Sequence, residues 1–511
     1  MTRLTRISLM LGFFFLVDKI LAILRQVIIA RQFGLSSDLD VFNVANNLPD
    51  LLFALISGGA IAIAFIPVLS EVLSKEGKNE SWKLFSRVAN LAFLITGILS
   101  LVIALLADYI VGWEFGIAPG FNLSQQSLVI KLMRLNLIAT LIFSMSGFAM
   151  AGLQANQHFF LPALAPILYN LGQIFGAIFL APSKGYVLFG IILPAMNLGV
   201  YGLVYGVILG SILHLIIQIP GLIIYKFKWI PDFGIKNHHV QKVLKLLGPR
   251  LITVLFVQLI FIVRDNLGSR LSEGAVSALS YGWMIQQVPE TLIGTAIGTA
   301  ILPTLAEQFS KDDVNAFQAT VQRAIRVLIG ITIPISMIMI VSIRPLLEFA
   351  FGFETQDTNL LMWVTRGYLI GLAGHCLLEI NARSFYARQN AVVPLMAAIL
   401  NVSIYISVGS LLYKTIGAAG ISLTDSLAFT GQAIFLFIIL NKRLIAPINI
   451  KNTLIRSILA AGISATFSFI VMSLLYKNSM SLIIIIIGSL IPSGIIMLLI
   501  MRDEINELRR L

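Results

Sequence analysis

The chain has 511 residues, of which 58% are hydrophobic and only 12% are charged, and its mean hydropathy is +0.92. This composition excludes a soluble globular protein and indicates a chain that lies mostly within a lipid bilayer. The formal net charge of +12 is explained by basic loops beside anionic lipid and requires no nucleic-acid partner. A single cysteine, Cys376, excludes an intramolecular disulfide and a Cys-x-x-Cys metal or redox motif.

Apolar segments follow one another along the whole chain, each long enough to cross the roughly 30 Å of hydrocarbon in a bilayer. They are predicted at 7–30, 41–70, 84–107, 129–152, 160–181, 197–224, 243–267, 278–305, 319–342, 358–386, 391–413, 417–440, 452–475 and 480–500. We therefore predict an all-α membrane protein with 14 transmembrane helices. The connecting loops are too short to hold a soluble catalytic domain, so any function must be carried out within the membrane.

A duplication is visible in two pairs of short phrases. Pro49-Asp50 and Pro67 to Glu71 return as Pro289-Glu290 and Pro303 to Glu307, and Ala155, Gln157 and Pro162 return 232 positions later as Ala387, Gln389 and Pro394. These spacings make the repeat unit six helices, an even number, so both copies have the same orientation. We predict two six-helix lobes related by a pseudo-twofold axis along the membrane normal, plus two C-terminal helices.

The repeat gives the domain boundaries, and the basic residues give the orientation. We predict an N-lobe at 1–224, a cytoplasmic linker at 225–242, a C-lobe at 243–441, two further helices at 452–500 and a cytoplasmic tail at 501–511. With a cytoplasmic N-terminus, 23 of the 36 Lys and Arg residues fall on the cytoplasmic side and 9 on the other. Because cytoplasmic loops carry an excess of basic residues, both termini are predicted to be cytoplasmic.

Charge persists inside the first predicted helix, at Asp18, Lys19 and Arg25. A charged group at the bilayer centre costs at least about 2.5 kcal/mol unless it faces protein or water. Asp18 and Arg25 are seven residues apart and therefore share one face of the helix. Two interpretations stay open: these groups line a hydrated cavity, or Asp18 pairs with Arg25 or Lys19 as a packing device.

The second predicted helix opens with four polar residues on one stripe, Asp40, Asn43, Asn47 and Asp50, whose spacings of three and four residues suit a helix. Together with the first helix they are predicted to form the wall of a cavity. The alternative is that Asp40 merely caps the helix.

The second half has fewer internal cations. Arg264 and Asp265 end the segment 243–267, and His375, Glu379 and Arg383 follow one another at steps of four residues. Glu379 and Arg383 have the order that favours an ion pair on a helix. A purely structural role for these groups stays open.

The phrases Arg25 to Gly34, Asp40-Val41-Phe42, Asn47 to Leu52 and Ala64 to Pro67 resemble the N-terminal signature of the MurJ/MviN lipid II flippase family. This family belongs to the multidrug/oligosaccharidyl-lipid/polysaccharide exporter superfamily. Phe385-Tyr386-Ala387-Arg388-Gln389 with Pro394 continues the likeness, which extends over nearly the whole chain and includes the fourteen-helix count.

The resemblance implies a bacterial inner-membrane protein that is not an enzyme. It would move lipid II, the lipid-linked peptidoglycan precursor, from the inner to the outer leaflet by alternating access. Residues matching family positions then become candidate substrate contacts, with Arg25 as the first choice for the diphosphate. The predicted set is Lys19, Arg25, Asp40, Asn47, Asp50 and Arg264. Phe53 and Met284 depart from the family, because cations are expected at both positions, and Arg264 is a candidate replacement.

Other functions and the energy source stay open. A flippase for another undecaprenyl-diphosphate-linked glycan would share the fold and the cavity. A drug/cation antiporter would favour acidic, aromatic-lined sites, whereas the first helix here is cationic, and a membrane glycosyltransferase would need carboxylates in a large outer loop. The chain has no G-x-x-x-x-G-K-[ST] phosphate-binding loop, so direct use of ATP is not expected. A coupling cation, Na⁺ or H⁺, would bind at Asp265 or Glu379. We expect no cofactor or bound metal, lipid II and membrane lipid as partners, and a monomer.

Overall fold

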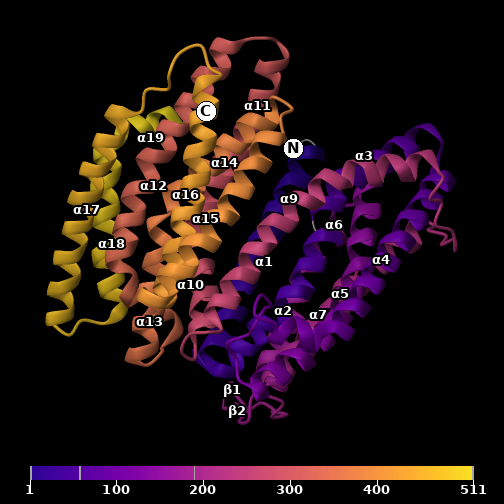
Figure 1. Cartoon of the computed structure of the whole chain (residues 1–511), viewed down its shortest axis with the longest axis horizontal. Helices are drawn as coiled ribbons and strands as arrows, with labels where there is room; N and C mark the ends of the chain where they lie inside the picture. The colour runs from indigo at the N-terminus through magenta and orange to yellow at the C-terminus, as the bar shows by residue number, and fades with distance from the viewer. Residues whose placement is uncertain (1–2, 57–58, 189, 509–511) are drawn as a thin grey trace. The chain divides into compact units, whose positions relative to one another are not determined.

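A computed structural model describes residues 3–56, 59–188 and 190–508, and nearly all of them lie in helices. The chain divides into two compact units, Met1–Arg270 and Leu271–Leu511. Within each unit, long helices pack side by side (Figure 1). The domain boundaries given above follow the sequence repeat and stay a prediction.

The regular elements among the described residues of the first unit are helices and one short hairpin. They are α1 (Arg3–Phe33), α2 (Ser37–Ile56), α3 (Gly59–Lys75), α4 (Lys78–Gly112), α5 (Leu123–Ala155), α6 (Phe160–Phe175), the π-helix η1 (Gly176–Leu180), β1 (Val187–Leu188), β2 (Ile191–Ile192), α7 (Val200–Ile216), α8 (Ile219–Ile224) and α9 (His238–Gly268). The two strands pair antiparallel, with Val187 opposite Ile192.

Glycines bring α6 and η1 into backbone contact with α7. A Cβ atom on Gly172 would lie 2.4 Å from the Cα of Gly210, and one on Gly176 would lie 2.6 Å from the Cα of Gly206. Small residues permit this close approach between membrane helices. The contact fixes the position of α6, which carries Asn170 of the candidate site.

An aromatic cluster joins α4 to the segment that precedes α9. The ring of Phe227 lies 5.2 Å from that of Trp82 and 5.0 Å from that of Phe85, with edge-to-face geometry in both pairs. Such pairs are more favourable than their buried area alone would give. The cluster continues inward to Phe65 and Phe148, on α3 and α5.

Hydrogen bonds also hold the segment 225–237 against α4. The Nε1 of Trp82 donates to the carbonyl of Tyr225 at 3.1 Å, and the amide of Asn90 donates to the carbonyl of Ile230 at 2.8 Å. Arg87 pairs with Asp232 at 2.6 Å. The hydrogen bond from Arg87 lowers the pKa of Asp232 below its ordinary value, so the pair is intact at neutral pH.

Ion pairs tie both ends of α9 to other elements of the first unit. Lys242 lies 2.6 Å from Glu71 of α3, and Arg270, just beyond the helix, lies 2.8 Å from Glu114. The helix α9 corresponds to the predicted segment 243–267, the first helix of the predicted C-lobe. Its packing partners include α2, α3 and α4 of the first unit.

The second unit is also helical. It contains α10 (Ala275–Glu290), the π-helix η2 (Thr291–Thr295), α11 (Ala296–Ser310), α12 (Val314–Phe351), α13 (Thr355–Ile370), α14 (Leu372–Ala387), α15 (Val392–Ile416), α16 (Ala418–Lys442), α17 (Lys451–Lys477), α18 (Leu482–Ile500) and α19 (Arg502–Leu508).

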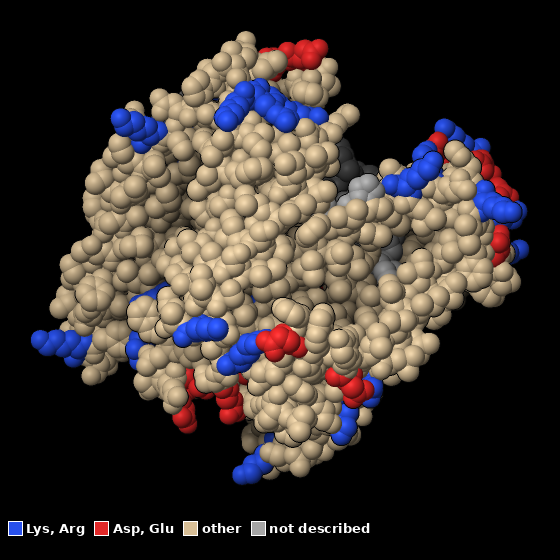
Figure 2. Space-filling view, viewed as in Figure 1, with Lys and Arg blue, Asp and Glu red and all other residues tan. Residues whose placement is uncertain are grey.

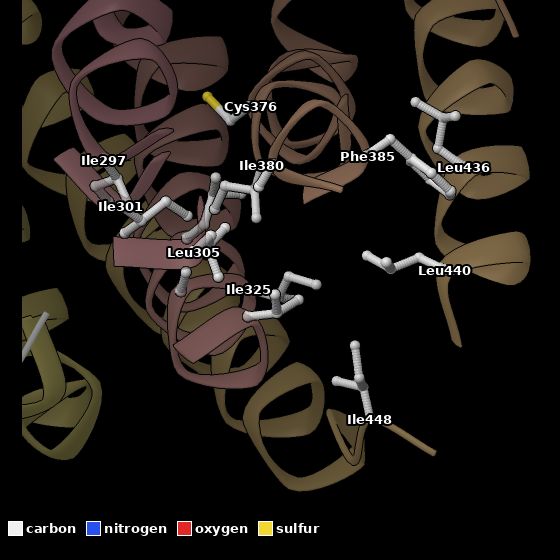
Figure 3. Packing of buried hydrophobic residues seen from close by; sticks show 14 of the residues in the cluster. Ile297, Ile301, Leu305, Ile325, Cys376, Ile380, Phe385, Leu436, Leu440 and Ile448 are labelled. Atoms are coloured by element: carbon white, nitrogen blue, oxygen red, sulfur yellow. The ribbon is translucent and has the colours of Figure 1, made fainter. Parts of the chain in front are cut away.

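Its apolar core lies between α11, α12, α14 and α16. Leu305, Ile325, Ile380 and Leu436 are each completely buried there and come from these four helices in turn (Figure 3). The single cysteine, Cys376, is part of the same core. The last helices, α17 and α18, pack side by side (Figure 1) and both contact α12.

The helices have the lengths and composition of membrane spans. Within the described residues, 11 helical segments are long and apolar enough to cross a membrane, and they coincide with predicted segments. The other predicted segments, 7–30, 41–70 and 243–267, lie in α1, in α2 with α3, and in α9, and their crossing stays a prediction. On the face that Figure 2 shows, charged side chains gather toward the ends of the helices and a broad uncharged band lies between them.

Local backbone geometry repeats at matched positions in the two halves. Gln157 and Gln389, which are 232 residues apart, both have positive φ, 60° and 55°, a conformation that is uncommon outside glycine. Gly199 before α7 and Gly417 before α16 have positive φ as well, 53° and 68°. Positive φ is ordinary for glycine, so only the agreement between Gln157 and Gln389 is in line with the duplication inferred from the sequence.

Candidate functional site

Asn170 of α6 joins two charged residues of α1. Its Oδ1 accepts a hydrogen bond from the Nη1 of Arg25 at 2.9 Å, and its Nδ2 donates to the Oδ1 of Asp18 at 2.8 Å. Asp18 and Arg25 therefore share one face of the helix, as their spacing predicted. Asn170 is itself buried, at 4% exposure. The amide bridge restricts the guanidinium of Arg25 between α1 and α6.

Lys19 occupies a different environment from its neighbour Asp18. Its side chain is exposed, and its Nζ lies 5.2 Å from the centre of the Phe15 ring on the same helix. A cation over an aromatic face at an exposed site gains only about 0.5–1 kcal/mol. Lys19 is therefore free to change partners at little cost.

A second polar network connects α2 to α9. The buried carboxylate of Asp265 accepts one hydrogen bond from the Nε of Arg264 and one from the amide of Asn47, both at 2.7 Å. The Arg264 guanidinium also lies over the ring of Phe261, 5.1 Å from its centre. Residues that the sequence singled out on two different segments thus form one network, in which Asp265 accepts hydrogen bonds from a cation and an amide.

Asp40 is buried near the start of α2, with 2% of its surface exposed. The hydroxyl of Ser36 accepts a hydrogen bond from the backbone N–H of Leu39 at 3.3 Å. Ser36 therefore supplies a cap at the start of the helix, and Asp40 lies in its first turn.

A pocket of about 490 Å³ opens within the first unit, between α2, α5, α6 and α7. This volume is in the range of sites for small molecules. Asp50 contributes the carboxylate of its wall and is exposed to the open space. The lining residues are Asn46, Pro49, Asp50, Phe53, Asn136, Ala139, Thr140, Phe143, Gly147, Met150, Ala151, Gln154, Pro166, Tyr169, Val207 and His214.

Aromatic rings form a continuous row along this pocket. Phe53 meets Phe143 with ring centres 5.0 Å apart, and Phe143 meets Tyr169 at 4.8 Å, both edge to face. Phe53 stands at a position where the family resemblance implies a cation. In this chain the position instead extends the aromatic wall, and the nearest charged member of that wall on α2 is the acidic Asp50.

His214 is part of the pocket wall, and its ring is held by hydrogen bonds with buried polar residues. Its Nδ1 shares a hydrogen bond with the hydroxyl of Ser146 at 2.6 Å, and the amide of Gln218 donates to the same hydroxyl at 2.8 Å. All three residues are buried. This polar cluster fixes the orientation of the imidazole ring at the pocket.

In the second unit, the predicted ion pair on α14 is confirmed. The Nη2 of Arg383 lies 2.7 Å from a carboxylate oxygen of Glu379, and its Nη1 donates to the hydroxyl of Thr299 at 2.8 Å. His375, one turn earlier, takes a different partner: its Nε2 lies 2.8 Å from the buried carboxylate of Asp425 on α16. The charge of Glu379 is thus balanced by Arg383 on the same helix, whereas His375 links α14 to α16.

Sequence reasoning missed Asn170, His214 and Asp425. Asp425 carried a usable signal, because a carboxylate inside the apolar segment 417–440 is as costly as the charges noted elsewhere. Asn170 and His214 are neutral polar residues in apolar segments and were not distinguished from ordinary helix contacts. Among the residues that the structure describes, no group of three or more His, Cys, Asp or Glu side chains could hold a metal ion.

Comparison with known proteins identifies close sequence relatives. The family model described as "Lipid II flippase MurJ" matches residues 29–495. The lipid II flippase MurJ of Burkholderia cenocepacia is 30% identical over 452 residues, which cover 86% of this chain and 84% of that protein. The probable lipid II flippase MurJ of Vibrio cholerae is 26% identical and covers 84% of this chain and 82% of its own length.

Solved structures show the same fold. A lipid II flippase MurJ in an inward closed conformation matches with a TM-score of 0.78 at 22% identity, covering 97% of this chain and 100% of the matched chain. An inward-facing multidrug resistance transporter of the MATE family, in the MOP superfamily, matches with a TM-score of 0.68 at 14% identity, covering 83% of this chain and 94% of its own.

Proposed function

Since the chain belongs to the lipid II flippase MurJ family, we propose that it carries lipid II from the inner to the outer leaflet of the bacterial cytoplasmic membrane by alternating access. It acts as a transporter and not as an enzyme. The cargo's diphosphate and its disaccharide-peptide cannot cross hydrocarbon unaided, while its polyprenyl tail stays in lipid. The protein therefore has to offer polar contacts to the headgroup within the membrane.

The observation that carries this proposal is the partly buried Arg25, which Asn170 orients from another helix. A guanidinium donates two parallel hydrogen bonds to a phosphate group, which makes arginine suited to diphosphate recognition. The amide of Asn170 engages one guanidinium nitrogen and holds Asp18 beside it. We assign Arg25 as the main diphosphate contact, with the exposed Lys19 as a second cation.

For alternating access we propose the architecture that the sequence repeat predicts. The chain would have 14 spans in two six-helix lobes related by an axis along the membrane normal, with α17 and α18 outside the repeat. The matched rare conformations of Gln157 and Gln389 support it. A central cavity formed between such lobes is the usual place for the substrate of a repeat-built transporter. The protein would act as a monomer.

The energy source is proposed to be the membrane potential or a coupled cation, Na⁺ or H⁺. A potential of 100 mV supplies about 2.3 kcal/mol per elementary charge moved. Asp265 and Glu379 are the carboxylates proposed for a cation. Both now have a basic partner, Arg264 and Arg383 respectively, so cation binding would have to displace that partner.

Complementation tests the proposal directly. The gene should restore growth to a bacterium depleted of its own lipid II flippase, and the purified protein in vesicles should make labelled lipid II accessible from the opposite face. Transport of a different undecaprenyl-diphosphate-linked glycan, with lipid II left behind, would favour the second candidate function. Failure with both cargoes would refute the proposal.

Both termini are proposed to be cytoplasmic, which predicts the side on which each loop can be labelled. Asn79 lies at the start of α4 and Leu123 at the start of the following helix, α5, and both are exposed. A cysteine introduced at Asn79 should react with an impermeant thiol reagent only from the cytoplasmic side, and one at Leu123 only from the outer side. The native Cys376 is buried and gives a low background. Reversed labelling would overturn the orientation.

A further inference from the structure

Asp50 presents a carboxyl group to the pocket of the first unit. The structure gives it no hydrogen bond and no ion pair within the described residues, and its side chain is exposed to the pocket. Arg25 is near enough to act on it electrostatically. However, Arg25 is also linked through Asn170 to Asp18, so its charge is shared, and Asp50 is the one acidic side chain in the pocket lining.

The pocket also has the walls of a site for an organic cation. Phe53, Phe143 and Tyr169 form the aromatic row described above. Aromatic faces attract ammonium groups through the ring quadrupole, and a carboxylate beside them adds direct charge attraction. An anion would be repelled by Asp50. An inorganic cation binds oxygen ligands and would make no use of the aromatic rings.

We infer that this pocket binds a primary ammonium group on the peptide part of the cargo. The inference rests on the proposed function, because it assigns one more contact to the same substrate. A cell-wall precursor that is cross-linked through its peptide must arrive with a free amine on that peptide, since the amine is the nucleophile that forms the new amide bond. At neutral pH such an amine is protonated and matches a carboxylate next to aromatic rings.

The pocket and Arg25 would then recognise opposite charges of one molecule. Arg25 on α1 takes the anionic diphosphate, and Asp50 on α2 takes the cationic end of the peptide. Both helices belong to the first unit. A glycan carrier with no amine would lose the second contact, so the pocket distinguishes peptide-bearing cargo from other lipid-linked diphosphates.

The test compares two forms of lipid II on the full-length protein in lipid nanodiscs, one with its peptide amine free and one with that amine acetylated. Wild type should bind the acetylated form about tenfold more weakly, the size expected for a partly desolvated cation site. Asp50→Asn keeps the shape of the side chain and should bind both forms equally. The matched control is Asp108→Asn, which removes an exposed carboxylate paired with Arg134 and should keep the tenfold preference.

The outcomes separate this inference from the proposed function. Equal binding of both forms by wild type, or a preference that survives in Asp50→Asn, would overturn the ammonium site while leaving lipid II transport intact. Loss of the preference when Na⁺ replaces K⁺ in the buffer would assign the pocket to the inorganic cation Na⁺ and overturn the ammonium site too. Failure to bind either form would overturn the proposed function, and the ammonium site with it.

Discussion

Replacing Arg25 with alanine is expected to abolish growth of a flippase-depleted strain while the protein still inserts into the membrane. The change removes the guanidinium that Asn170 orients, and each charge-assisted hydrogen bond lost to the diphosphate is worth about 1.5–3 kcal/mol. Loss of two such bonds would weaken headgroup binding by a factor of a hundred or more, on the order given by the affinity relation. Growth on depletion medium and the amount of protein in isolated membranes are the two measurements.

The conservative variant Arg25→Lys should restore growth only in part, because a lysine ammonium cannot reproduce the two parallel bonds of the guanidinium fork. The matched control is Arg134→Ala, which removes an exposed arginine paired with Asp108. It should grow like wild type, since exposed ion pairs contribute about 0–1 kcal/mol. Full growth of Arg25→Ala, or its failure only through loss of protein from the membrane, would remove the headgroup role from Arg25.

A single methyl group on Gly172 is expected to destabilise the first unit. The new Cβ would lie 2.4 Å from the Cα and 2.5 Å from the backbone nitrogen of Gly210, so the two helix backbones would have to move apart. Overpacking of this kind costs about 1–3 kcal/mol for added methylenes, and backbone atoms cannot give way as side chains do. Gly172→Ala should lower the melting temperature, and Gly172→Leu should prevent recovery of a monodisperse protein in detergent.

Gly462 of α17 provides the control, because a Cβ there would meet nothing within 4 Å. Gly462→Ala and Gly462→Leu should give the elution profile and melting temperature of wild type. If Gly172→Leu behaved like Gly462→Leu, the close contact between α6 and α7 would not be present in the folded protein.

The helices could largely be predicted from the sequence, because long apolar runs are dictated by the thickness of the bilayer. Local relations along one helix could also be predicted: Asp18 and Arg25 share a face, and Glu379 pairs with Arg383. These depend on the helical period alone. They need no knowledge of which helices are neighbours.

The rest of the site depends on pairings between distant helices, which no local pattern encodes. Asn170 is 145 residues from Arg25, and Asp265 is 218 residues from Asn47. The association of α9 with the first unit likewise depends on contacts such as Lys242 with Glu71. The pocket at Asp50 could not be inferred either, because its wall is assembled from four helices.

Because segment 225–237 is attached to α4, the length of unanchored chain in front of α9 is reduced. A chain of thirteen free residues could reach about 45 Å when extended. Its anchors at Tyr225, Ile230 and Asp232 leave residues 233–237 as the part beyond the last of these anchors, about 17 Å of contour on the same scale. The basic segment 225–237 therefore has only a few residues that are not anchored to α4. Lengthening it with glycine and serine beyond Asp232 would add reach only at the end that leads into α9.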